Sequence, residues 1–233
     1  MARRPGASYH VGLVPEQIVA EALSLTEESH LLGWSLRDLA QRCGVTVSVI
    51  THHVGAKDKL LRSVVAAALS ELTPPPSSAA WEDWFRAMLH EIQPPLRRYP
   101  GTAKWVLLHG PSFPSILPMI DAGVATLQQA GFADMTGLAF ATLFNNAVMT
   151  IAIADERLLD DGEGSRDHGQ MMRHFLETGE GSPGVAVLDT TLMATFASGT
   201  AGAETAREGY YRFVIDTTIA GLAPYARARP RGR

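Results

Sequence analysis

Hydroxyl, imidazole and ammonium groups gather in one short stretch of the chain, between residues 46 and 57. Such groups donate hydrogen bonds to phosphate oxygens and to base edges, and the methyl group of a threonine or valine can contact the thymine methyl. The side chains concerned are Thr46, Val47, Ser48, Thr51, His52, His53 and Lys57. Their types and spacing predict a surface that binds DNA.

The paired histidines also raise the question of a metal site. Adjacent residues of a helix point about 100° apart, so a metal ion would find one ligand at His52 and His53 rather than two. His168 and His174 lie in a polar connection without a convincing arrangement of carboxylates around them. We therefore expect phosphate or surface roles for the paired histidines, and neither a metal nor another cofactor in this chain.

A helix that precedes the stretch is well marked. Residues 35–43 predict it, because Ser35 and Asp38 can cap its first amides and Gly44 can end it. Its apolar stripe consists of Leu36, Leu39, Ala40 and Cys43. The stripe indicates that one side of this helix packs against a core.

A second, very short helix is expected to come next, with Thr46 as its cap. Val45 and Ile50 would face the core, which leaves the polar side chains outside. An amphipathic helix, a turn containing glycine and a short polar helix make up the helix-turn-helix arrangement, in which the second helix enters the major groove of DNA.

The local charge supports this orientation. The whole chain has a formal net charge of -4, so DNA binding must come from the distribution of its charges. Five cations surround the two helices against only Asp38 and Asp58: Arg37, Arg42, Lys57, Lys59 and Arg62. We expect the acidic residues of a first helix, at 15–29, to lie elsewhere. Arg3 and Arg4 would form either a minor-groove arm or a solvated tail.

Residues 18–61 resemble the DNA-binding region of the TetR (tetracycline-repressor) family. The stretch SLRDLAQRCGVTVSVITHHVGAKDKLL is similar to that family's recognition region almost position for position, in the ordered combination S-L-R-x-L-A, G-V-T, H-H-x-G-x-K and L-L. The resemblance implies an all-α homodimer, in which each subunit presents its recognition helix to one half of a palindromic operator.

Three residues depart from the family pattern. Thr51 stands where the family usually has a phosphate-contacting Tyr, and Val54 where it usually has Phe. His30 stands where a Gly commonly closes the first helix, so we expect His30 in a left-handed conformation. The loss of the Tyr moves the expected phosphate contacts toward the paired histidines and Lys57.

The fold class that we expect is all-α, with an N-terminal three-helix DNA-binding domain joined by a connecting helix to an all-helical ligand-binding and dimerisation domain. The predicted divisions are 1–56 for the helix-turn-helix domain, 57–226 for the helical domain and 227–233 for a basic disordered tail. The run TPPPSSAA at 73–80 cannot continue a helix through its prolines and separates the N-terminal unit from the later helices.

The composition fits a globular protein, because 46% of the residues are hydrophobic and 19% are charged. We expect no apolar run that approaches the ~20 residues of a membrane span. The start, MARRPGASYH, lacks the apolar stretch of a secretory signal. The predicted location is cytoplasmic, without a membrane partner, and the single cysteine, Cys43, excludes an internal disulfide.

The second half is expected to form helices near 80–93, 100–109, 114–130, 133–159, 185–198 and 203–222. The runs L-R-R-Y-P-G, QQAGF, LFNNAVMTIAIADE and RFVIDTTIAGL are similar to C-terminal domains of tetracycline-repressor-like members, although more weakly than the first half. The resemblance implies that the last two helices form a dimeric four-helix interface, with Phe213, Ile215, Ile219 and Leu222 among its buried residues.

The same resemblance implies a ligand pocket enclosed by the long middle helices. Apolar walls with a few polar groups suit a small molecule, and the candidates are Trp105, His109, Phe113, Phe144, Asn145 and Met149. Asn145 and Asn146 are the sharper clues, since an amide buried in an apolar helix needs a partner. The alternative is ordinary core packing for the apolar candidates, and a helix-end position for His109.

Three functions are compared. The leading hypothesis is a ligand-responsive repressor that binds palindromic operator DNA as a homodimer and is released by a small apolar or amphipathic effector. The second is a degenerate helix-turn-helix protein that acts as a binding module without specific DNA recognition. An enzyme is disfavoured, because its candidate residues look like a solvated helix end and loop: Asp155, Glu156, Asp160, Asp161 and His168.

Overall fold

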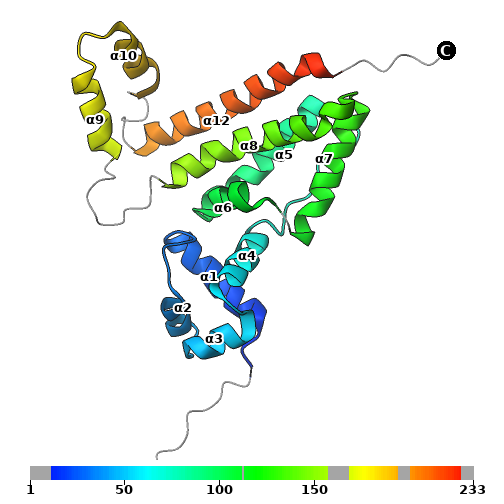
Figure 1. The fold of residues 1–233 in the computed structure, drawn as a ribbon, viewed down its shortest axis with the longest axis vertical. Coiled ribbons are helices and arrows are strands. Elements are labelled where there is room, and N and C mark those ends of the chain that lie inside the picture. Colours follow the sequence, from blue (N-terminus) through cyan, green and yellow to red (C-terminus); the bar gives the residue numbers. More distant parts are fainter. Residues whose placement is uncertain (1–11, 112, 157–167, 194–199, 227–233) are drawn as a thin grey trace, which may run out of the picture.

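The computed structural model describes residues 12–111, 113–156, 168–193 and 200–226, and within these ranges it contains helices and turns but no strand. The α-helices are α1 (Pro15–Glu28), α2 (Leu36–Arg42), α3 (Val47–Val54), α4 (Lys57–Ala68), α5 (Trp81–Arg98), α6 (Thr102–His109), α7 (Leu117–Gln129), α8 (Thr136–Glu156), α9 (His168–Thr178), α10 (Pro183–Leu188) and α12 (Thr200–Leu222). Helices α1 to α4 gather at one end, and α5 to α8 with α12 form the larger body (Figure 1). The predicted all-α class is confirmed.

Local signals explain the boundaries of the N-terminal helices. Pro15 occupies the first turn of α1. Ser35 caps α2, because its Oγ accepts from the amides of Arg37 and Asp38, while the Asp38 carboxylate accepts from the Ser35 amide at 2.8 Å. Gly44 ends α2 with a φ of +67°, a conformation that glycine adopts without strain.

Helix α4 connects the two parts of the molecule. It packs against α1 on one side and against α6 on the other. Its apolar positions Leu60, Leu61, Val64 and Val65 are all buried. The exact division of the chain at residue 57 stays a prediction, since α4 is shared between both parts.

Helix α5 is longer than the sequence predicts. The sequence predicts an end near 93, yet the helix continues through prolines 94 and 95 to Arg98. A proline inside a helix removes one backbone hydrogen bond and is costly. Here Leu96 is completely buried, and Arg97 and Arg98 pair with acids on α12 and α1, so tertiary contacts hold the last turn.

Helix α8 is the central helix of the larger body, where it contacts α5, α6, α7 and α12. With the short turn before it, Ala133–Glu156 is by length and composition long and apolar enough to cross a membrane, with a mean hydropathy of 1.6. This differs from our expectation that no segment reaches that length. One such helix is weak evidence for a membrane span, because the core helix of a soluble protein passes the same test.

Some predicted features fall outside the described residues. Arg3, Arg4, Asp160, Asp161 and the tail at 227–233 are among them. The expected helix at 185–198 is described only to 193, as α10 followed by a π turn at Asp189–Met193. Its start at Pro183 lies two residues earlier than expected, because Ser182 caps it through its side chain.

Candidate nucleic-acid interface

Helix α3 presents a polar side and an apolar side. Ile50 and Val54 are buried on the apolar side, which anchors the helix to the unit formed by α1, α2 and α4. Val45 packs half-buried beside them, as predicted. The exposed predicted side chains on or just before α3 are Thr46, Ser48, His52 and His53, while Val47 and Thr51 are half-buried. Of the predicted DNA-contacting side chains of α3, the structure leaves Ser48, His52 and His53 accessible, whereas Val47 packs against the core and Thr51 is half-buried.

The hydroxyl groups near α3 differ in whether they can donate a hydrogen bond to a ligand. The Oγ atoms of Thr46 and Ser48 are 2.8 Å apart, so one donates to the other and one donor is left for a ligand. The Thr51 hydroxyl donates to the carbonyls of Val47 and Ser48, each at 3.2 Å. Thr51 would have to rotate away from its own helix to donate to a phosphate.

Lys57 is engaged as well. Its Nζ donates to the Trp34 carbonyl at 2.7 Å and lies 5.2 Å from the centre of the Trp34 ring. This cation therefore ties the start of α4 to the turn before α2. Any phosphate that it contacts would share the ammonium group with that carbonyl.

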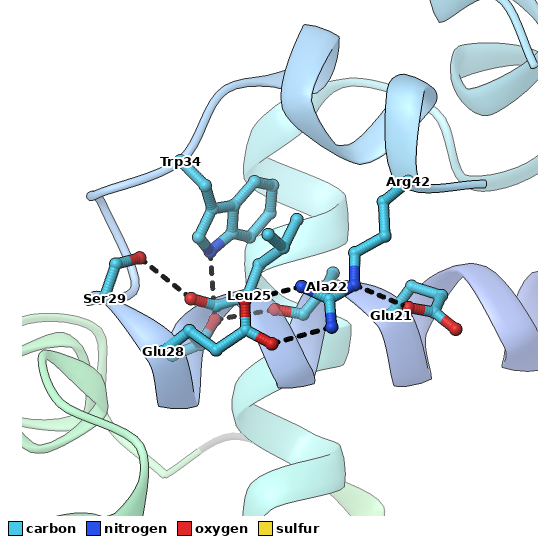
Figure 2. Close-up of polar contacts among 8 residues, drawn as sticks. Glu21, Ala22, Leu25, Glu28, Ser29, Trp34 and Arg42 are labelled. Atoms are coloured by element: carbon cyan, nitrogen blue, oxygen red, sulfur yellow. Dashed lines mark hydrogen bonds and ion pairs between the residues drawn. The ribbon is translucent and has the colours of Figure 1, made fainter. Parts of the chain in front are cut away.

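Arg42 does not add to the positive surface as expected (Figure 2). Its guanidinium forms a bidentate pair with Glu28 at 2.6 and 2.7 Å and a further bond to Glu21 at 2.9 Å. The acids of α1 thus lie next to one of the five cations, contrary to the prediction that they lie elsewhere. The reason is that α2 crosses α1, which brings their polar edges together, and this pairing lowers the pKa of Glu28.

Three cations remain available on the same unit. Arg37, Lys59 and Arg62 are exposed, and within the described residues none of them forms an ion pair. They flank α3 from α2 and from α4, where exposed cations suit the phosphates of a duplex. Gly55 closes α3 with a φ of +82° and so sets the tight connection into α4.

The prediction for His30 is wrong. Ala133 is the only described residue other than glycine with a positive φ, so His30 is not left-handed. Helix α1 ends at Glu28 and is capped by Ser29, whose amide and hydroxyl both donate to the Leu25 carbonyl. His30 turns into the molecule and is only 2% exposed.

A small cavity lies within the larger body. Its volume is about 10 Å³ and its lining is entirely apolar: Leu72, Met88, Ile92, Pro111, Ile116, Met119, Ile120, Phe140 and Phe144. A space of that size holds about one water molecule. Leu72 belongs to the segment that leaves α4, so the cavity touches the connection to the DNA-binding unit. Sequence reasoning found only Phe144 among these residues, because the others look like ordinary core positions.

The six predicted effector residues are divided between three places. Phe144 lines the cavity, whereas Trp105 stacks between His109 and Phe113, with ring centres 4.4 and 5.6 Å apart. The other two, Asn145 and Met149, are exposed on α8 away from the cavity lining. Asn146, the second amide clue, is also exposed and donates to Thr218 of α12.

The predicted interface residues of α12 are divided in the same way. Ile215 and Ile219 are buried within the protomer, where α12 packs on α8 and α5. Phe213 is 62% exposed, and Leu222 is half-buried. Other exposed apolar side chains lie on α8 (Leu138, Met149 and Ile153) and on α12 (Tyr210).

The candidate catalytic residues do not form a site in the described part of the chain. Asp155 is buried, and burial raises its pKa to about 7 although its carboxylate accepts from the Gly101 amide at 3.1 Å. Glu156 pairs with Lys104 at 2.6 Å. The described residues contain no group of three potential metal ligands.

One curated protein of known class is similar to part of this sequence. The chain is 27% identical over 138 residues to an "HTH-type transcriptional regulator" of Saccharopolyspora erythraea. The match covers 59% of this chain and 58% of the relative, so the chain spans little more than half of the curated relative that it matches. No family model matches the chain.

Solved structures match over nearly the whole chain. Apo ActR from Streptomyces coelicolor superposes with a TM-score of 0.70 at 18% identity, over 94% of this chain and 100% of ActR. The chain has the TetR-family fold. A TetR variant from Acinetobacter baumannii AYE in complex with minocycline gives a TM-score of 0.64 at 17% identity, over 93% and 99% of the two chains. The sequence predicts α3 as the recognition helix of this fold, and the apolar cavity lies among the middle helices.

Proposed function

We propose that this chain is a transcriptional regulator that represses by binding palindromic operator DNA as a homodimer and is released by a small apolar or amphipathic effector. The single observation that carries the proposal is the division of α3 into a buried apolar side and an exposed polar side. Its apolar side is anchored by Ile50 and Val54, while its polar side and the flanking Arg37, Lys59 and Arg62 stay exposed. That arrangement suits a helix that enters the major groove between two phosphate backbones.

Homodimer formation is supported by the exposed apolar side chains of α8 and α12. A monomer that exposes Phe213, Met149 and Ile153 on two packed helices carries an apolar surface that a second copy of the same helices would cover. A two-fold interface of this kind would set two copies of α3 side by side, as a palindromic site requires.

The effector would be apolar, at least in the part that enters the protein. The cavity exposes no polar atom, and in its present form it has room for about one water molecule. Binding must therefore open it, and the ligand must prefer the opened state to affect DNA binding. Minocycline bound to the Acinetobacter TetR variant is a precedent in this fold for a bound small molecule.

A mobility-shift assay with DNA from upstream of the chain's own gene tests the proposal. We expect a specific complex whose association constant falls steeply between 50 and 200 mM salt, because phosphate contacts release counterions. Arg37→Gln should reduce the slope of that dependence, and Glu82→Gln, on α5 outside the α1–α4 unit, serves as a control. Absence of any specific, salt-sensitive complex would contradict the proposal.

The alternative of a binding module without DNA recognition rests on Thr51, whose hydroxyl is turned to its own helix, and on the engagement of Lys57 and Arg42 by protein groups. A complex that forms equally on all DNA sequences, with an affinity that does not change in Arg37→Gln, would favour this alternative.

A further inference from the structure

His30 lies at the joint between the DNA-binding unit and the larger body. It comes directly after α1, and its ring covers Gly101, at the start of α6, so closely that a Cβ added to Gly101 would lie 2.3 Å from the ring. Next to it, the Leu31 amide donates to the Pro100 carbonyl at 2.8 Å. The segment 30–31 and the segment 100–101 thus fit together as a lock that only a glycine at 101 permits.

The hydrogen bonds of the ring define its protonation. Nδ1 accepts from the Leu32 amide at 3.1 Å, so Nδ1 carries no proton and the neutral ring holds its proton on Nε2. Nε2 faces Oε1 of Glu156 at 3.6 Å. Both atoms are buried, and neither makes a hydrogen bond. A buried donor and a buried acceptor therefore face each other just beyond bonding distance.

Charged groups approach this ring from every element that packs on it. Helix α8 brings Glu156 and, through the Gly101 amide, Asp155. Helix α6 brings Lys104, whose Nζ holds the other oxygen of Glu156 at 2.6 Å. The charges of Glu27 on α1 and Arg98 on α5 pair with each other at 3.0 Å, and Arg97 acts on Asp155 from the end of α5.

Burial has the largest influence on the pKa of the ring and lowers it. The negative charge of Glu156 raises this pKa, and the positive charge of Lys104 lowers it further. His30 is therefore neutral at neutral pH, and it takes up its second proton only at acidic pH.

We propose that His30 is a proton-sensitive latch, which holds the helix-turn-helix unit against α6 and α8 while the ring is neutral and releases it when the ring takes a second proton. The proposal rests on the proposed function, since its consequence is a change in DNA affinity. A proton on Nδ1 would place an N–H against the Leu32 N–H, so that amide would lose its acceptor. The turn from 30 to 33 leads directly into Trp34 and α2, and it must move to relieve this contact.

Release would loosen the helix-turn-helix unit relative to the rest of the molecule. Two recognition helices bind a palindrome well only when each is held at the right spacing, so a loosened latch weakens operator binding. Any exposed group that gains positive charge on the DNA side as the pH falls acts in the opposite direction. The contribution of His30 must therefore be measured as a difference between variants.

The experiment measures operator affinity from pH 7.5 to 5.5 for the full chain, His30→Gln and the control His53→Gln. We expect the parent protein and His53→Gln to lose at least fivefold in affinity relative to His30→Gln over this range. In Glu156→Gln, which removes the anion facing Nε2, the pKa of the latched ring falls further, so the loss should begin at the same pH and become larger. Profiles of the parent protein and His30→Gln that agree within twofold would overturn the latch.

A measurement without DNA separates the latch from the proposed function. NMR of the parent protein tracks the His30 ring and the Leu32 amide through the same pH range, and we expect the amide to lose protection from hydrogen exchange as the ring takes its second proton. If no DNA fragment binds at any pH, the proposed function fails, while this coupling still decides the latch. A Leu32 amide that stays protected after the ring is protonated would overturn it.

Discussion

The DNA-binding unit and the larger body differ in how their sites are built. The α1–α4 unit presents polar side chains outward from a small, well-anchored scaffold. The body encloses a cavity of about 10 Å³ without a polar atom in its lining. The polar side chains of the first region are accessible in the structure as it stands, whereas any ligand larger than about one water molecule would have to open the cavity. A regulator of the proposed kind needs both, because only the site that changes can transmit a signal.

Removal of Trp34 should have the largest effect on the DNA-binding unit. The indole is 4% exposed, donates to the Thr26 hydroxyl at 3.0 Å and underlies Lys57. We expect Trp34→Ala to lower the free energy of unfolding by about 3 to 5 kcal/mol, the usual range for a buried aromatic residue. Urea denaturation checks this. Unfolding of α1–α4 alone, with the body still folded, would support the distinction between the two regions. A change in the free energy of unfolding below about 1 kcal/mol would contradict it.

Asp155 provides a test in the body. Its pKa of about 7 means that the folded protein holds this proton more tightly than the unfolded chain does. Its stabilising contribution is therefore complete below the ordinary pKa of an aspartic acid and is lost as the pH rises through 7. Asp155→Asn should gain stability over the parent between pH 4 and 8, on the order of 3 kcal/mol.

Urea midpoints of both proteins at several pH values measure that difference. The contribution of His30, which has the opposite sign, is present in both proteins and cancels. A difference that does not change with pH would show that Asp155 titrates normally.

Variants on the polar side of α3 and at the start of α4 should affect base specificity and overall DNA affinity separately. We expect Ser48→Ala to change the preferred bases, at a cost of about 1 to 3 kcal/mol at its own base pair. Lys57→Met should weaken all operators similarly if Lys57 contacts a phosphate, as we propose, while the apolar stem of the methionine would still cover Trp34. Selection from a randomised operator library checks both. Equal losses across all sequences in both variants would contradict these roles.

Arg42 should give the smallest effect. Since Glu21 and Glu28 occupy its guanidinium, Arg42→Gln should leave the salt dependence of DNA binding unchanged and cost at most about 1 kcal/mol of stability, as exposed ion pairs do. Arg37→Gln is the matched comparison, because Arg37 is exposed and should lower the salt slope by about 0.9. Equal slopes in the two variants would break the distinction between scaffold and DNA-contacting cations.

The sequence predicted the DNA-binding unit closely because its signals are local. The Ser35 cap, Gly44 and the apolar side of α3 each act within a few residues. It missed what depends on contacts between distant segments. Arg42 meets α1 only in the fold, and His30 is buried against Gly101, 71 positions further along the chain. The same limit applies to the cavity, because Phe144 and Leu72 meet only after α4, α5 and α8 pack together.

The most direct test of the account is a footprint of the purified protein on the DNA upstream of its own gene, combined with the mass of the complex. We predict two equally protected major-groove segments, related by two-fold symmetry, with their centres about 34 to 36 Å apart or a multiple of one helical turn, in a complex that contains protomers in pairs. A single protected segment, or a complex of uniform protection with no symmetry, would contradict the claim that this chain reads a palindrome through paired copies of α3.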